Sequence, residues 1–235
     1  MKKAVLFLLA SVLLLTSCSA FAGEEYAEPI LFRGVEWGVP YSIVQKALPD
    51  GIKMYDLKKT EYWYPMTDMM YDGNGWGNQL KGELGCYTYA KSSSVKETKV
   101  AGYAIDNLYL YFIYLPDENG KIIRDDNHTA FIYGCYKLEP KDPDAVYDDL
   151  VSKLTSIYGD VDEEKSNSSI IDDKMCLWNG KDGTMVSVFR QDYSSGTHEI
   201  YIKYGFMGGD DLMQNAYEAL VREETENAAS DIDGL

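Results

Sequence analysis

VAGYAIDNLYLYFIYL, residues 100–115, is the strongest strand signal in the 235-residue sequence. Aromatic and β-branched residues favour the pleated, packed surface of a sheet. From residue 108 onward both sides of the expected strand are apolar or aromatic: Leu108, Leu110 and Phe112 alternate with Tyr109, Tyr111 and Ile113. A strand of this kind is packed on both sides, so we expect a central strand of a sheet.

Further strand signals follow towards the C-terminus. Residues 129–138 (TAFIYGCYKL) and 198–206 (HEIYIKYGF) each predict one strand. The turn residues 179–183 (NGKDG) separate two apolar runs, 174–178 and 184–190, and this arrangement predicts a hairpin.

The helix signals come from end residues and from periodicity. Asp142 can cap free N–H groups, Pro143 suits a first turn, and Gly159 suits the position after the last turn, so a helix is expected between them. A short helix is expected after Pro40. Residues 208–227 show the spacing of an amphipathic helix.

Together these signals predict an α+β fold with an antiparallel sheet or sheets and a few helices. One domain is expected over residues 30–207, built from two tandem helix-plus-sheet half-repeats at about 30–122 and 123–207. The helix over 208–227 and a disordered tail over 228–235 would complete the chain.

The N-terminus predicts export. Lys2 and Lys3 precede an uncharged apolar run over residues 4–15, which is too short for a stable membrane span and of the length of a signal-peptide core. Residues 15–18 (LTSC) resemble a bacterial lipobox, in which the thiol of Cys18 would receive a diacylglyceryl group and become the first residue.

On this hypothesis residues 1–17 are a lipoprotein signal peptide and residues 18–29 a tether, and two acyl chains hold the protein on the outer face of the cell membrane. The alternative is cleavage after Ala22 at an A-x-A site. Residues 1–22 would then be removed, and a secreted protein would start at Gly23.

The charge balance restricts the partners. The chain holds 22 Lys and Arg against 38 Asp and Glu, a net charge of −16, and loss of Lys2 and Lys3 with the signal peptide leaves 20 against 38, a net of −18. Phosphate backbones repel such a body. Nucleic acid is therefore excluded as the main partner.

Three cysteines remain if Cys18 carries lipid: Cys86, Cys135 and Cys176. One disulfide with one buried thiol, or three buried thiols, would both satisfy this count. No two of the three have C-x-x-C spacing, so neither a structural zinc site nor any other cofactor is indicated.

Four short motifs carry a resemblance: FRGVEWG (32–38), VAGY (100–103), KLTSIYG (153–159) and WNGKDGT (178–184). With these motifs the chain resembles uncharacterised exported lipoproteins of Firmicutes. Its order of elements is similar to tandem helix-plus-sheet folds of the β-lactamase-inhibitor-protein type. This resemblance implies a fold whose modules typically bind or scaffold, and it brings no catalytic residues.

Catalytic and metal-binding patterns are weak. The chain has two histidines and no G-x-S-x-G elbow, and the serines near His198 lie in a turn, so no catalytic residue is assigned. Residues 125–128 (DDNH) form a polar loop without the spaced ligands of a calcium site, so no metal is expected there.

Tyrosine is the residue type with functional potential that is unusually frequent, with 20 tyrosines in the chain. A glycine-rich loop, residues 62–76, carries the candidate ligand-binding residues Trp63, Tyr64, Tyr71 and Trp76. Their rings would anchor a partner or stack on sugars, or they would fold back as a lid over the sheet.

The sequence thus favours a non-enzymatic, lipid-anchored surface module that binds a protein partner. The alternatives are a module that binds carbohydrate or peptidoglycan, a cell-wall glycan, through residues 62–76, and an extracytoplasmic hydrolase that uses paired carboxylates.

Overall fold

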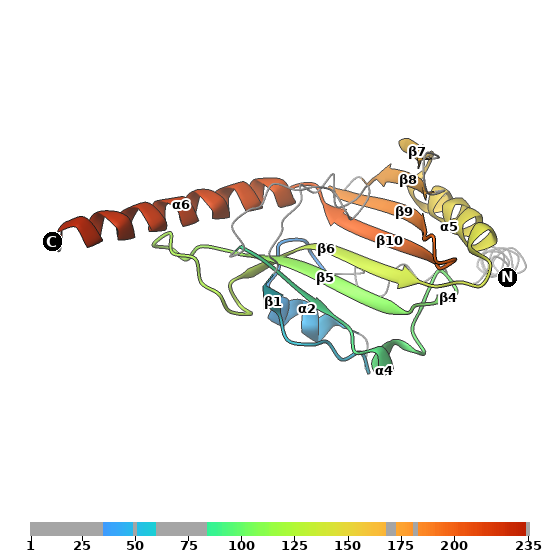
Figure 1. Ribbon diagram of the computed structural model, residues 1–235, viewed down its shortest axis with the longest axis horizontal. Coiled ribbons are helices and arrows are strands. Elements are labelled where there is room, and N and C mark those ends of the chain that lie inside the picture. The colour runs from blue at the N-terminus through green and yellow to red at the C-terminus, as the bar shows by residue number, and fades with distance from the viewer. Residues whose placement is uncertain (1–34, 49–50, 60–83, 168–172, 181–182, 234–235) are drawn as a thin grey trace, which may run out of the picture.

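The fold is an antiparallel sheet with helices, as seen in a computed structural model that describes residues 35–48, 51–59, 84–167, 173–180 and 183–233 (Figure 1). The predicted α+β class is confirmed. Within the described residues the main sheet has eight strands in the order β1-β2-β5-β6-β10-β9-β8-β7. Their bounds, in that order, are Lys58–Lys59, Gly85–Tyr89, Asn107–Tyr114, Thr129–Leu138, His198–Phe206, Thr184–Asp192, Asp173–Asn179 and Glu163–Asn167.

The helices of the described residues are α2 (Tyr41–Ala47), α4 (Ser92–Val95), α5 (Pro143–Tyr158) and α6 (Gly209–Asp233). The predicted capping of α5 is confirmed, because the Asp142 carboxylate accepts a hydrogen bond of 3.2 Å from the Ala145 backbone N–H. Gly159 follows the last turn with a φ of 92°, a left-handed value that glycine adopts without strain.

The run over 100–115 is not one strand. Lys99–Val100 (β3) pairs with Tyr103–Ala104 (β4) in a small separate hairpin, and β5 begins only at Asn107. Ala101 has a φ of 50° and Gly102 a φ of 89°. Two successive residues with positive φ reverse the chain, so the strand predicted from residue 100 is interrupted there.

The sheet consists of two similar halves. In the first half α2 is followed by β1, β2, β5 and β6, and in the second half α5 is followed by β7, β8, β9 and β10. The last strands of the two halves, β6 and β10, pair at the centre, with Ile200 opposite Leu138. This order places the boundary between Leu138 and Pro143. The predicted boundary at residues 122 and 123 instead falls between β5 and its pairing partner β6.

Helices α2 and α5 pack on the same face of the sheet, which we call the helix face. The ring of Tyr41, on α2, makes an edge contact with Phe112 of β5 at 5.3 Å between centroids. The hydroxyl of Tyr147, on α5, donates to Cys176 Sγ of β8 at 3.3 Å. The paired strands place one row of side chains on this face, running from β5, which contacts α2, to β8, which contacts α5. The row is Leu108, Tyr136, Ile202, Val188 and Cys176.

Helix α6 leaves the end of β10 and extends away from the sheet to the C-terminal end of the molecule (Figure 1). Met213, Ala216 and Leu220 are buried, which places them on one face of the helix. The helix continues to Asp233, so the disordered tail predicted from residue 228 is wrong for residues 228–233. Among the helices of the described residues, none combines the length and apolar character that crossing a membrane requires.

Candidate functional site

The face opposite the helix face carries a group of tyrosines, and we call it the tyrosine face. On β2 and β5 alternate residues are tyrosine, so strand geometry turns these rings to one side. On β5 the leucine side is fully buried while the tyrosine side is half-buried. The tyrosines of this face on the central strands are Tyr87, Tyr89, Tyr109, Tyr111, Tyr133 and Tyr201.

Rings on neighbouring strands contact one another. Tyr87 lies 5.7 Å from Tyr111 and Tyr89 lies 6.2 Å from Tyr109, measured between ring centroids. Tyr55, just before β1, lies 4.7 Å from Tyr89. Aromatic pairs at about 4.5–7 Å attract one another beyond simple burial, so the rings support one another as a surface of fixed shape.

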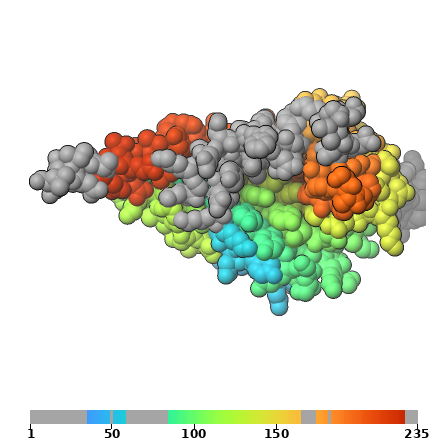
Figure 2. Space-filling model, viewed as in Figure 1, coloured from blue at the N-terminus to red at the C-terminus, as the bar shows by residue number. Residues whose placement is uncertain are grey.

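The part of this face nearest β1 combines tyrosines with lysines. We call it the tyrosine–lysine patch and define it by Tyr55, Lys58, Tyr87, Tyr89, Lys91 and Tyr109. Figure 2 shows the cyan segment 51–59 beside the green segment that begins with β2. Tyr55 is 42% exposed, and both lysines are exposed, so the patch is a surface.

Backbone hydrogen bonds hold the patch in place. The Tyr55 N–H donates to the Tyr89 carbonyl at 3.0 Å, and the Lys91 N–H donates to the Lys53 carbonyl at 2.7 Å. The Ser94 hydroxyl of α4 accepts from the Lys53 N–H at 3.0 Å. The segment before β1 is therefore fixed along the edge of β2.

The two lysines of the patch contact aromatic groups. Lys58 Nζ donates to the Tyr89 hydroxyl at 3.1 Å and lies 4.7 Å from the centroid of that ring. Lys91 Nζ lies 5.2 Å from the centroid of Tyr55. Such cation–π geometry is favourable. The hydrogen bond with Tyr89 raises the pKa of Lys58, so this ammonium stays charged at neutral pH.

A buried carboxylate lies elsewhere on the tyrosine face. Glu199 of β10 accepts hydrogen bonds from Lys137, Tyr193 and Tyr201, and the bond from Tyr193 is 3.0 Å long. Burial alone would raise the pKa of Glu199, but Lys137 and the two phenols reverse that effect and lower it. The carboxylate is an ionised structural centre that links β6 to β10.

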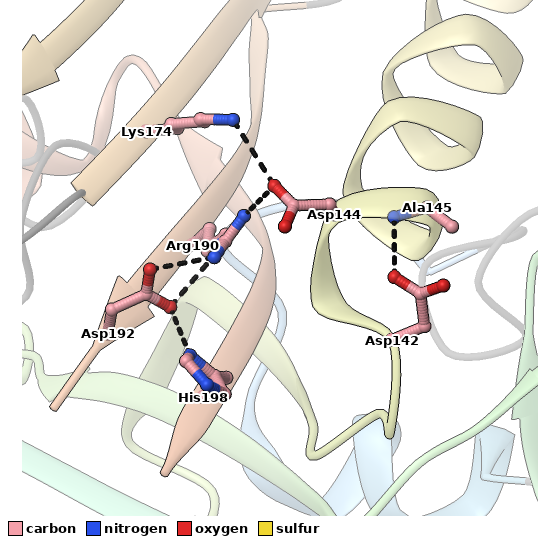
Figure 3. Close-up of polar contacts among 7 residues, drawn as sticks. All are labelled: Asp142, Asp144, Ala145, Lys174, Arg190, Asp192 and His198. Carbon is pink, nitrogen blue, oxygen red and sulfur yellow. Dashed lines mark hydrogen bonds and ion pairs between the residues drawn. The ribbon is translucent and has the colours of Figure 1, made fainter. Parts of the chain in front are cut away.

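A second polar cluster lies on the helix face, and we call it the α5 anchor. Figure 3 shows the Arg190 guanidinium between Asp192 of its own strand and Asp144 in the first turn of α5. Arg190 Nη2 lies 2.7 Å from Asp192 Oδ2, and His198 Nδ1 lies 2.6 Å from Asp192 Oδ1. Lys174 Nζ lies 3.4 Å from Asp144. The buried Arg190 thus ties α5 to the sheet.

The pKa of each carboxylate in this anchor reflects its cationic neighbours. Burial opposes ionisation of Asp192, but Arg190 and His198 outweigh it and lower the pKa of that carboxyl. Arg190 is the main cause of the lowered pKa of Asp144. Both carboxylates are ionised at neutral pH.

His198 and Asp192 form a hydrogen-bonded pair like that of a catalytic histidine and its carboxylate, with the two side chains 2.6 Å apart. The nearby Ser195 hydroxyl donates to Thr197 Oγ1 at 3.1 Å. In the part of the chain that the structure describes, no hydroxyl or thiol forms a hydrogen bond with His198. The contacts that the structure does show, through Asp192 and Arg190, link β10 and β9 to α5.

In the loop over residues 125–128, the Asp125 carboxylate forms its hydrogen bonds within the loop itself. Asp125 Oδ1 accepts from the Asn127 N–H at 2.8 Å, from the His128 N–H at 3.0 Å, and contacts His128 Nδ1 at 2.9 Å. Across the described ranges, no three His, Cys, Asp or Glu side chains come together in a way that could hold a metal ion.

The site residues predicted from the sequence lie elsewhere in the chain. Cys18 and the aromatic loop with Trp63, Tyr64, Tyr71 and Trp76 are outside the described residues. Of the two possibilities for the remaining cysteines, the structure shows three buried free thiols: Cys86, Cys135 and Cys176.

Sequence reasoning missed the tyrosine–lysine patch. The signal that could have found it is the alternation of tyrosine at residues 87 and 89 with the same alternation at 109 and 111. Comparison of the chain with protein-family models, with curated proteins and with solved structures finds no match.

Proposed function

We propose that this chain is a non-enzymatic, extracytoplasmic binding module that holds a protein partner at the tyrosine–lysine patch. The observation that carries the proposal is the patch itself, a set of half-buried and exposed tyrosine rings on one side of β2 and β5. The N-terminal signal supports a location outside the cytoplasm, and lipid on Cys18 would tether the module to the membrane.

Tyrosine suits a protein interface for a physical reason. Its ring offers a large contact area, its hydroxyl offers a hydrogen bond, and only two side-chain torsions are immobilised on binding. Interfaces are enriched in tyrosine, and a few such residues carry most of the binding free energy.

The patch is also organised before binding. Tyr87, Tyr89 and Tyr109 project from paired strands, where backbone hydrogen bonds fix the positions of the rings. Their mutual contacts restrict the rings further. A surface that is already ordered loses less conformational entropy when a partner binds.

Exposed Tyr55 and half-buried Tyr87 allow a direct test by photo-crosslinking in intact cells of the native host. A photoreactive phenylalanine analogue replaces Tyr55 or Tyr87 of the full chain, and the matched control replaces Tyr217 of α6, an exposed tyrosine that lies outside the patch. Adducts are separated by mass before and after treatment with a muramidase.

We expect one discrete protein adduct from positions 55 and 87 and none from position 217. The absence of any adduct from the patch, or the same adducts from position 217, would overturn the proposal. An adduct that the muramidase dissolves would overturn it in favour of a peptidoglycan partner.

A further inference from the structure

The lysines of this chain are unevenly distributed, and the excess lies around the patch. Residues 51–59 and 91–99, which border it, hold six lysines and two acidic residues, whereas the whole chain holds 22 basic and 38 acidic residues. The lysines are Lys53, Lys58, Lys59, Lys91, Lys96 and Lys99, and the acidic residues are Asp56 and Glu97.

The two lysines of the patch have no carboxylate partner, a state they share with other exposed lysines of the described ranges such as Lys46 and Lys121. Lys137, Lys153, Lys174 and Arg190 each form an ion pair with a carboxylate of the protein. Over the described ranges no carboxylate forms such a pair with Lys58 or with Lys91. Both ammonium groups are therefore open to a carboxylate from outside the chain.

Unpaired ammonium groups determine what can cover them. A neutral or basic surface that buried Lys58 and Lys91 would remove two charges from water without compensation, which costs free energy. A carboxylate at the same place would replace the lost hydration with a charge-assisted hydrogen bond.

The tyrosines of the patch add donors for the same kind of partner. Lys58 donates to the Tyr89 hydroxyl, so the proton of that hydroxyl remains available. Among the described contacts the hydroxyls of Tyr55 and Tyr87 have no hydrogen-bond acceptor. A phenol donates readily to a carboxylate, so the patch offers three hydroxyls and two ammonium groups to a carboxylate partner.

We infer that the segment bound at the tyrosine–lysine patch is an acidic stretch of a partner protein, held by carboxylate contacts to Lys58 and Lys91 between the tyrosine rings. This inference rests on the proposed function and adds the chemical class of the partner. The remainder of the protein is acidic and repels such a segment, so the attraction guides it to this edge.

The first test uses a defined probe, a fluorescent poly-L-glutamate of about ten residues, with the full chain in neutral detergent and at low salt, where charge contacts are least screened. The variant Lys58→Gln/Lys91→Gln removes both ammonium groups. The matched control Lys46→Gln/Lys121→Gln removes two exposed lysines outside the patch. Two further probes are uncharged poly-L-glutamine and vesicles of the anionic lipid phosphatidylglycerol.

We expect poly-L-glutamate to bind the wild type and the control alike, and the patch variant about tenfold more weakly, because two exposed ion pairs are lost. Poly-L-glutamine should not bind. Equal binding by patch and control variants, no binding of poly-L-glutamate, or binding of the vesicles alone would overturn the inference.

The crosslink from position 87 separates this inference from the proposed function. In the Lys58→Gln/Lys91→Gln background we expect the protein adduct to be lost, while the control background keeps it. If the adduct persists at full yield in the patch variant, the partner is not acidic there, and the binding function still stands. If no background gives an adduct, the proposed function fails.

Discussion

Trp37 Nε1 donates a hydrogen bond of 2.8 Å to Thr184 Oγ1, although 147 positions separate the two residues. Trp37 precedes α2 in the first half of the sheet, and Thr184 begins β9 in the second half. The indole ring also stacks on Phe131 of β6 at 4.9 Å and on Phe206 of β10 at 6.0 Å. The two halves therefore share one packed core.

Substitution of Trp37 should destabilise both halves together. Trp37→Ala removes the stacking and the hydrogen bond and should cost about 2–4 kcal/mol, whereas Trp37→Phe or Thr184→Val should cost about 1 kcal/mol. Urea unfolding, followed by circular dichroism and by tryptophan fluorescence, measures the change. Two separate transitions in the wild type would contradict a shared core.

The α5 anchor should make stability depend on pH in the acidic range. The pKa of Asp192 is below its ordinary value of 3.8 in the folded protein. The stabilisation is therefore fully present above the unfolded value and is lost as the pH falls through the folded value. The free energy of unfolding should decrease between about pH 5 and pH 2, and less so in Asp192→Asn.

Asp148→Asn is the matched control for this experiment, because Asp148 is an exposed carboxylate of α5 outside the anchor. Its pH profile should follow that of the wild type. A profile for Asp192→Asn that is as steep as the control's would show that the anchor contributes nothing to the pH dependence.

The three buried thiols should be unreactive in the native protein. Burial raises the pKa of Cys86 to about 12 and that of Cys135 to about 11. The thiolate is the nucleophile, so neither cysteine should react appreciably with iodoacetamide at about pH 8. All three described thiols should react in denaturant, and rapid labelling of the folded chain would contradict their burial.

The lipid anchor predicts a specific mass. If Cys18 is modified, the protein extracted from membranes begins at Cys18 and carries a diacylglyceryl group, and Cys18→Ser abolishes that form. Intact mass spectrometry distinguishes this product from a chain that starts at Gly23. Recovery of the unmodified chain with residues 1–22 still attached would refute export.

Local signals predicted the elements that depend on few residues. The bounds of α5 follow from Asp142 and Gly159, which act on the neighbouring backbone, and β10 matches the predicted range 198–206. Strand β7 (Glu163–Asn167) escaped prediction because it is a charged edge strand without alternation of apolar residues.

The sequence shows the tyrosine alternation of the patch but not how its segments come together. Its residues come from three segments, and only the pairing of β1 with β2 and of β2 with β5 brings them together. Lys58 lies opposite Tyr87, and Tyr89 lies opposite Tyr109. Register between segments this far apart along the chain depends on tertiary packing, which the sequence pattern of each segment does not reveal.

The affinity of the crosslinked partner for patch variants is the most direct measure of binding at the tyrosine–lysine patch. With the partner purified, binding of the full chain is compared for the wild type, Tyr55→Ala, Tyr87→Ala and the matched control Tyr217→Ala, after thermal unfolding confirms that all are folded. We predict that Tyr87→Ala weakens binding about thirtyfold, as at an interface hot spot, and that Tyr217→Ala leaves it unchanged. Equal affinity for all four proteins would contradict the account.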